Sequence, residues 1–296
     1  MKPEQLLDAL AAVDDASLEE VNARRQQKKS RRWGRWAALA ACLCLVTGIF
    51  LWRSAPAAQK EQPGITLSED GVTIPPMEVS LSANENADML AFFIYQGRCY
   101  VQYEWIDHGD ALVGEYLGTA TGLIDEWTPQ EGYVDLAGSV QGDFYAVNGY
   151  DPSFMLCMAY EDGQVSTYVC NTGITLKYGR ELFEDRLHLS ENLASASWET
   201  RESWYHSQGE VHPFQSEEAL SDFLAAIDEA EFLPSDQVQP SLVDLEEYHF
   251  YLELTNGTTV HLRLSEGGYV RYQGLWDVCV QIPPENYQAL CVQFTP

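Results

Sequence analysis

The chain has 296 residues, of which 46% are hydrophobic, so it can bury the core of one or two domains. Its formal net charge is -28, and residues 61–296 carry 39 Asp and Glu against seven Lys and Arg. A surface this acidic repels phosphate backbones, which argues against nucleic acid as a partner of this region.

The first 32 residues are expected to form a cytoplasmic amphipathic and basic segment. Apolar residues recur at helical spacing near the start, and Ser17 with Glu20 has the pattern of a capping box. Helices this short bury too little to fold alone. One interpretation is therefore a frayed, interfacial N-terminus. The other is a docking helix that presents four side chains to a groove on a cytoplasmic protein partner: Leu6, Leu7, Leu10 and Val13.

Residues 33–52 are predicted to form a transmembrane helix in the lipid bilayer. No charged residue lies between Trp36 and Trp52, and a helix of these seventeen residues is about 26 Å long. That length is close to the roughly 30 Å hydrocarbon thickness of a bilayer. Trp and Arg prefer the two interfaces, and they flank the span here: Arg31, Arg32, Trp33, Arg35, Trp36, Trp52 and Arg53.

The charges around the span predict its orientation in the cell membrane. Residues 24–35 contain seven Lys and Arg, whereas only Arg53 and Lys60 follow the span closely. The positive-inside rule then keeps the N-terminus in the cytoplasm and places the C-terminal region outside. A cleaved signal peptide is the alternative, because Ala55-Pro56-Ala57 resembles a cleavage site. Signal peptides total about 15–30 residues, and the stretch before the span is already longer, which favours a retained anchor.

The outer region is predicted to be mainly β. Residues 53–88 have the composition of a linker and include a short hairpin in GITL…GVTIPP. Residues 89–205 contain short strands separated by regular turn signals, which is typical of a β-barrel or sandwich-like domain. Its first two strands, in AFFIYQGRCYVQYEWI, are expected to turn at Gln96-Gly97. Alternation along the second strand would place four side chains on one face: Cys99, Val101, Tyr103 and Trp105.

Residues 206–296 are predicted to form a small α+β domain, one helix on an antiparallel sheet. Ser216 is the expected N-cap of the helix, and Pro234 is expected to end it. The hairpin YHFYLELTNGTTVHLRL is expected to have a type I′ turn at Asn256-Gly257. Two strands and a short helix after Pro283-Pro284 complete the domain. The apolar stripe of the first helix consists of Leu220, Phe223, Leu224 and Ile227.

The segments VDDASLEEV and RRWGRWAALAACLCLV, with the basic run between them, resemble the N-termini of single-pass membrane proteins from clostridia-type Gram-positive bacteria. Some of those proteins have the layout of anti-sigma factors. The resemblance covers about fifty residues, and it implies the topology above and a regulatory role through the cytoplasmic helix. Residues 1–41 contain neither His nor Cys, so the zinc ligands of some anti-sigma domains are not expected here.

No pattern in the sequence predicts a catalytic, cofactor-binding or metal site, and we do not expect an enzyme. His206 and His212 could ligate a metal, but they lack a third ligand nearby. The stretch 107–110 (DHGD) is more simply a turn than half of an acid–base site. The adjacent Glu246 and Glu247 should point to opposite faces of a strand. An odd number of outer cysteines without CxxC argues against a disulfide framework, although Cys157 and Cys170 are close enough to bridge one hairpin.

Three classes of function remain. The first is a signalling or regulatory (anti-sigma-like) protein, in which an acidic outer domain senses or binds a ligand and the N-terminal helix reports inside. The second is a membrane-tethered binding or structural module without signalling. The third is an extracytoplasmic hydrolase, which the lack of a nucleophile–base motif disfavours.

Overall fold

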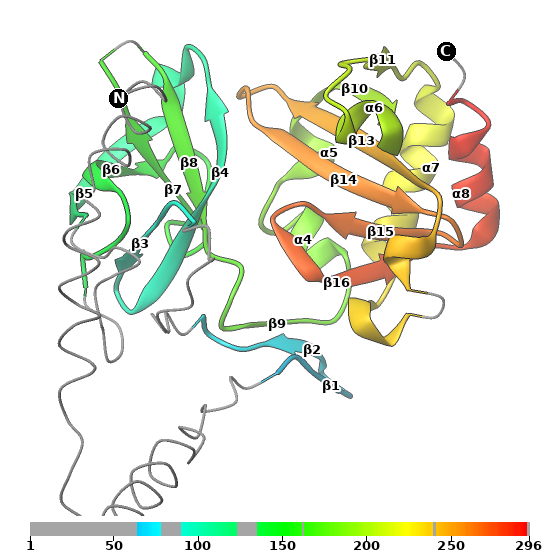
Figure 1. The fold of residues 1–296 in the computed structure, drawn as a ribbon, viewed down its shortest axis with the longest axis horizontal. Coiled ribbons are helices and arrows are strands. Elements are labelled where there is room, and N and C mark those ends of the chain that lie inside the picture. The colour runs from blue at the N-terminus through cyan, green and yellow to red at the C-terminus, as the bar shows by residue number, and fades with distance from the viewer. Residues whose placement is uncertain (1–63, 78–89, 123–134, 162, 239–240, 295–296) are drawn as a thin grey trace, which may run out of the picture. The chain divides into compact units, whose positions relative to one another are not determined.

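The computed structural model describes residues 64–77, 90–122, 135–161, 163–238 and 241–294 (Figure 1). All of them belong to one compact unit, residues 61–296, which is mainly β with few helices. No helix in this described part is both long enough and apolar enough to cross a bilayer. The transmembrane helix expected at 33–52, with its flanking residues, and the docking residues from Leu6 to Val13 lie outside the described ranges.

The first sheet has three antiparallel strands, β1 (Thr66–Ser68), β2 (Gly71–Ile74) and β9 (Ile174–Leu176). The predicted hairpin is therefore present, and part of the expected linker is folded. Val72 and Ile74 are buried in the main core, which provides the free energy that holds this segment in place. Gly71 has a φ of 113°, and a Cβ there would lie 2.4 Å from the carbonyl oxygen of Leu176, so only glycine fits.

The second sheet has six antiparallel strands. Gln96 and Gly97 both have positive φ, as the turn between the first two strands requires. A 3₁₀ turn, η1 (Gly109–Leu112), directly precedes strand β5 (Val113–Thr121) in the chain. The strand order is β3 (Phe92–Tyr95), β4 (Arg98–Ile106), β8 (Val165–Val169), β7 (Met155–Ala159), β6 (Gln141–Val147) and β5 (Val113–Thr121).

Residues 135–140 connect the two edges of this six-stranded sheet. On β3, the amide of Ile94 donates to Ala137 O at 2.8 Å, and Leu136 N donates to Ile94 O at 2.8 Å. On β5, Thr121 N donates to Leu136 O, also at 2.8 Å. The sheet therefore curls round an apolar cluster that is rich in aromatic rings: Phe93, Tyr100, Ala120, Phe144, Leu156, Met158, Tyr168 and Cys170.

The predicted alternation along β4 is wrong in its second half. The register of β4 against β8 shifts between Gln102 and Glu104, which marks a bulge. One extra residue reverses the faces beyond it, so Trp105 is 54% exposed while Ile106 is buried. The same shift directs Tyr103 and Glu104 toward the third sheet, as described below.

The third sheet has seven antiparallel strands. Its strand β10 and the short helix α6 (Arg201–Tyr205) precede the domain boundary expected at residue 205, but they belong to this sheet because β10 pairs along β13. The strand order is β11 (His212–Pro213), β10 (Leu193–Thr200), β13 (Glu247–Leu254), β14 (Thr259–Ser265), β15 (Tyr269–Tyr272), β16 (Leu275–Gln281) and β12 (Phe232–Pro234).

Two helices, α7 (Glu217–Glu229) and α8 (Pro284–Cys291), cover one face of the seven-stranded sheet (Figure 1). Ser216 caps α7 as predicted, because its Oγ accepts from Ala219 N at 3.3 Å. The predicted stripe packs on the core, with Leu220 half-buried and the other three residues buried. The remaining elements are short: α4 (Arg180–Phe183), α5 (Leu189–Asn192), η2 (Ser235–Gln237) and η3 (Leu242–Asp244).

Two local predictions in this region are wrong. Helix α7 ends at Glu229, and Pro234 lies in the edge strand β12, where a proline's missing N–H is tolerated. The β13–β14 turn is not type I′, because among its residues only Gly257 has a positive φ, of 90°. Leu254 N donates to Thr258 O, and Gly257 N donates to Leu254 O, so the loop has three residues with glycine in the left-handed position.

Candidate functional site: a charged cleft on the polar face of the third sheet

The face of the seven-stranded sheet opposite α7 carries polar and charged side chains. Along β13, Phe250, Leu252 and Leu254 join the core, while Glu247, His249 and Tyr251 alternate with them. The strand register places His249 opposite Arg263 and Glu247 opposite Ser265. It also places Arg263 opposite Arg271 on β15. Cross-strand pairing thus gathers residues from three strands into one polar layer.

Glu247 is the centre of this layer and is only 3% exposed. The Nε and Nη2 atoms of Arg263 donate to its Oε1 at 2.9 and 2.7 Å. Arg271 donates to Oε2 through Nη2. Two guanidinium groups therefore share one buried carboxylate, which leaves this group of three residues with a net positive charge. Such a pair of charge-assisted bonds also fixes the positions of both arginines.

Aromatic rings hold Arg263 from two sides. Its guanidinium carbon lies 5.4 Å from the ring centroid of Trp204 and 5.3 Å from that of Trp276. Trp204 also stacks on His249, with 4.4 Å between the centroids and 15° between the planes. Trp204 lies on α6, whose N-cap Thr200 accepts from Ser203 N at 3.2 Å. The short helix therefore covers part of the polar layer.

Two neutral histidines extend the layer. His249 Nδ1 and His261 Nε2 are 2.8 Å apart, so one ring donates to the other. Burial lowers the pKa of His249 to about 3, with a further decrease from Arg263, Arg201 and Arg271. Burial and the neighbouring His249 lower the pKa of His261 to about 3 as well. The 3.6 Å approach of His249 Nε2 to Glu247 Oε1 is therefore a contact with an uncharged ring.

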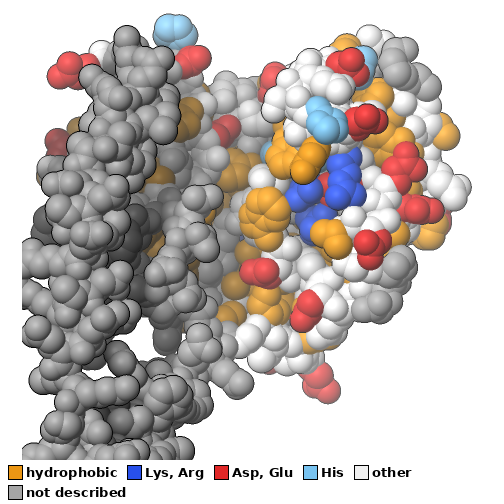
Figure 2. Space-filling model, viewed as in Figure 1, with side chains coloured by type: hydrophobic (Ala, Val, Ile, Leu, Met, Phe, Trp, Pro, Cys, Tyr) orange, Lys and Arg blue, Asp and Glu red, His pale blue; other side chains and the backbone are white. Residues whose placement is uncertain are grey.

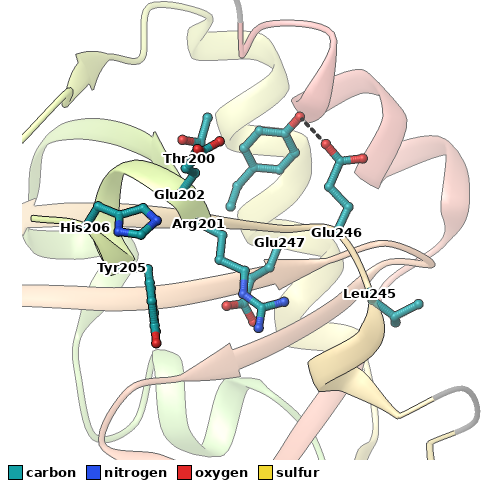
Figure 3. Close-up of a pocket in the computed structure, with 9 residues that line it drawn as sticks. Thr200, Arg201, Glu202, Tyr205, His206, Leu245, Glu246 and Glu247 are labelled. Carbon is teal, nitrogen blue, oxygen red and sulfur yellow. Dashed lines mark hydrogen bonds between the residues drawn. The ribbon is translucent and has the colours of Figure 1, made fainter. Parts of the chain in front are cut away.

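A cleft of about 530 Å³ opens where α6 meets the start of β13 (Figure 3). Arg201 extends from α6 toward Glu247, and its Nη1 donates to Val243 O at 3.0 Å. Glu246 lies on the other side of the cleft and accepts from the hydroxyl of Tyr248 at 3.4 Å. The cleft is lined by Thr200, Arg201, Glu202, Tyr205, His206, Leu245, Glu246, Glu247 and Tyr248.

The basic side chains are concentrated at this site. Residues 61–296 contain only seven Lys and Arg, and three of them, Arg201, Arg263 and Arg271, act together on His249. Figure 2 shows one patch of Lys and Arg on this face, with apolar side chains beside it. A positive patch on such an acidic chain is the most distinctive electrostatic feature of the described part.

Glu104 on β4 forms a second polar contact with the seven-stranded sheet. Its two carboxylate oxygens accept from Thr259 N at 3.1 and 3.2 Å, and Tyr103 Oη donates to Thr259 O at 2.9 Å. Burial raises the pKa of Glu104 to about 7. A cavity of about 300 Å³ lies here, and His261 lines it. The histidine pair therefore connects this cavity with Glu247 at the floor of the cleft.

The two histidines singled out as possible metal ligands lie apart in the structure. His206 lines the cleft, whereas His212 packs against Trp198 at 4.8 Å between ring centroids. In the described ranges, no three or more His, Cys, Asp or Glu are grouped so that they could hold a metal. Asp107 and His108 form a turn, with His108 at a φ of 59°, and the chain continues from Gly109 as η1. Cys157 and Cys170 are free thiols, and burial raises the pKa of Cys157 to about 12.

The main features of this site were not predicted from the sequence. Glu246 lies just before β13 and Glu247 is its first residue; both line the cleft, where Glu246 is exposed and Glu247 is buried. The signal was the two-residue period of EYHFYLEL and TVHLRLS, in which every second residue is polar or charged. Together with the three-residue loop between β13 and β14, which sets the strand register, that period predicts that His249 lies opposite Arg263.

Comparison with known proteins identifies no relative of this chain. No protein-family model, curated protein or solved structure matches it. The function of the cleft must therefore be inferred from its geometry and charge.

Proposed function

We propose that the chain is a single-pass membrane protein whose acidic outer region, residues 61–296, binds a ligand and whose N-terminal segment reports on binding inside the cell. One observation carries the binding function, namely a cleft of about 530 Å³ whose charged floor is fixed by buried ion pairs. Ligand sites typically have volumes of about 300–1,000 Å³ with a few positioned polar groups. A fixed charged floor needs no rearrangement on binding, which lowers the entropic cost of binding.

The membrane anchor and its direction are part of the same proposal. They rest on the uncharged stretch from Trp36 to Trp52 and on the seven basic residues that precede it. In this arrangement the protein is located in the cell membrane with its N-terminus in the cytoplasm. The curled six-stranded sheet, whose edges residues 135–140 connect, is proposed to be a small, partly closed β-barrel.

Thiol labelling in intact cells tests the anchor. Cysteines introduced separately by Ser17→Cys and Ser68→Cys are treated with a membrane-impermeant reagent, and the parent chain, whose five described thiols are buried or half-buried, gives the background. Ser68 lies on an exposed strand, so it should react at once, while Ser17→Cys should react only after permeabilisation. Labelling of Ser17→Cys in intact cells, or a soluble product that begins after residue 57, contradicts the proposal.

Copurification distinguishes a signalling protein from a tethered module. The full chain is compared with a Leu7→Glu/Leu10→Glu variant, which removes the apolar side chains proposed to dock, and with Glu4→Gln as the control. Loss of a cytoplasmic partner in the double variant alone supports signalling through the N-terminal helix. An identical set of copurified proteins for all three chains supports a tethered binding module.

A further inference from the structure

The cleft has one arginine, Arg201, and an exposed carboxylate, Glu246, on its opposite side; a second exposed carboxylate, Glu202, follows Arg201 on α6 and also lines the cleft. A guanidinium has five N–H donors, and the single bond of Arg201 goes to a backbone carbonyl, Val243 O. None of the ion pairs in the described part of the chain involves Arg201. Glu246, on the opposite side, likewise has no cationic partner there and accepts only from Tyr248. Both residues are exposed and available to a ligand.

The charged groups beneath the cleft already have hydrogen-bond partners. Arg263 and Arg271 are held by Glu247, and Glu199 accepts from Ser203 Oγ at 2.7 Å and from the hydroxyl of Tyr251. A ligand would therefore bind to Arg201 and Glu246 rather than displace the floor. Arg271 Nε and His249 Nε2 are buried without a hydrogen-bond partner beneath the cleft.

The charge of the whole region restricts the ligand further. Residues 61–296 carry 39 acidic against seven basic side chains, so an anion is repelled before it reaches Arg201. A simple cation is attracted, but it would leave the guanidinium of Arg201 without a counter-charge. A zwitterion has no net charge, so the acidic region does not repel it as it repels an anion. Its carboxylate and ammonium groups can pair with Arg201 and Glu246 at the same time.

We propose that the cleft binds a zwitterion of the size of an amino acid or short peptide, with the carboxylate on Arg201 and the ammonium group on Glu246. Tyr205 and Leu245 supply apolar surface for the rest of the ligand. Arginine is suited to this role because its planar donors match a carboxylate in a two-point contact. This inference deepens the proposed function, since the zwitterion is then the ligand of the outer region.

Titration of the full chain in a neutral detergent tests the inference. The probes are a panel of Ala-X dipeptides, each also prepared with an acetylated N-terminus or an amidated C-terminus. At least one free dipeptide should bind, and either cap should weaken its binding at least tenfold, because each cap removes one of the two charges. Tight binding of the acetylated form would show that only the arginine is used, and no binding by any free dipeptide would also overturn the inference.

Two substitutions assign the two ends of the ligand. Arg201→Gln should bind the free and amidated dipeptides equally weakly, while Glu246→Gln should fail to distinguish the free from the acetylated form. Arg98→Gln and Glu285→Gln remove exposed charges away from the cleft and should bind as the parent does. Thermal melting checks that each variant is folded. If the reverse pairing is found, or if both controls lose binding equally, the assignment is wrong.

The outcomes separate this inference from the proposed function. Dipeptide binding by a chain that labels at Ser17→Cys in intact cells would keep the zwitterion site and remove the anchor topology. Outward labelling at Ser68→Cys without dipeptide binding would keep the topology and remove the zwitterion site.

Discussion

The six-stranded and seven-stranded sheets bury their apolar side chains in different ways. The six-stranded sheet curls round its own aromatic cluster, with Phe93 at 4.7 Å from Phe144 and 5.1 Å from Tyr168 between ring centroids. The seven-stranded sheet buries one face under α7 and α8 and leaves charged residues on the other. Apolar burial stabilises without directional demands, whereas buried charge requires fixed partners. The second arrangement is the one that yields a preorganised site.

The largest expected effect is the removal of the central carboxylate by Glu247→Gln. The buried guanidinium of Arg271 and the half-buried one of Arg263 would lose their counter-charge, and breaking such a buried pair costs about 3–5 kcal/mol of unfolding free energy. Denaturant unfolding of the variant and parent measures the difference, with Glu266→Gln as an exposed control that should change little. A difference below about 1 kcal/mol would mean that the polar layer stabilises no more than a surface ion pair does.

A smaller loss is expected from Gly257→Val in the β13–β14 loop. Gly257 has a φ of 90°, and a β-branched residue there is strained at a cost of about 1–3 kcal/mol. Space is not the reason, because a Cβ would lie 3.6 Å from Ile106 Cγ2, an ordinary contact. Denaturant unfolding measures the loss. Thr255→Val, at an exposed position of ordinary φ in the same loop, provides the control. Equal stability of the two variants would contradict the three-residue loop.

The histidine pair predicts a loss of stability in acid. The pKa of His261 is lowered from 6.5 to about 3, so between these pH values the side chain is protonated in the unfolded chain but not in the folded one. The contribution of His261 is therefore fully present above pH 6.5 and is lost as the pH falls toward 3. His261→Gln should lower the slope of unfolding free energy against pH in that window. His108→Asn, which replaces an exposed histidine, should keep the parent slope.

Glu104 should act in the opposite direction, at the contact between the two sheets. Its pKa is raised from 4.5 to about 7, so the folded chain holds a proton that the unfolded chain releases. That contribution is present below pH 4.5 and is lost as the pH rises through 7. Glu104→Gln cannot ionise, and its unfolding free energy should decline less than that of the parent between these pH values. A decline as steep as the parent's would show that another group is responsible.

Much of the secondary structure could be predicted from the sequence. The Gln96-Gly97 turn, the Ser216 cap with its apolar stripe and the helix after Pro283 are all present, because each depends on neighbours within a few residues. The errors have local causes that a single sequence hides. A bulge in β4 places Ile106 rather than Trp105 in the core, and Pro234 lies in an edge strand instead of ending the helix.

By itself, the sequence determined composition, strand content and the separation of a basic, apolar N-terminus from an acidic remainder. Those properties follow from the order of residues along the chain. Only the tertiary structure decided that Arg201, Glu247, Arg263 and Arg271 meet, because they come from one helix and three strands spread over seventy residues. Strand register fixes such meetings, and a shift of one residue turns every side chain to the other face. The cleft is therefore a product of pairing rather than of any motif.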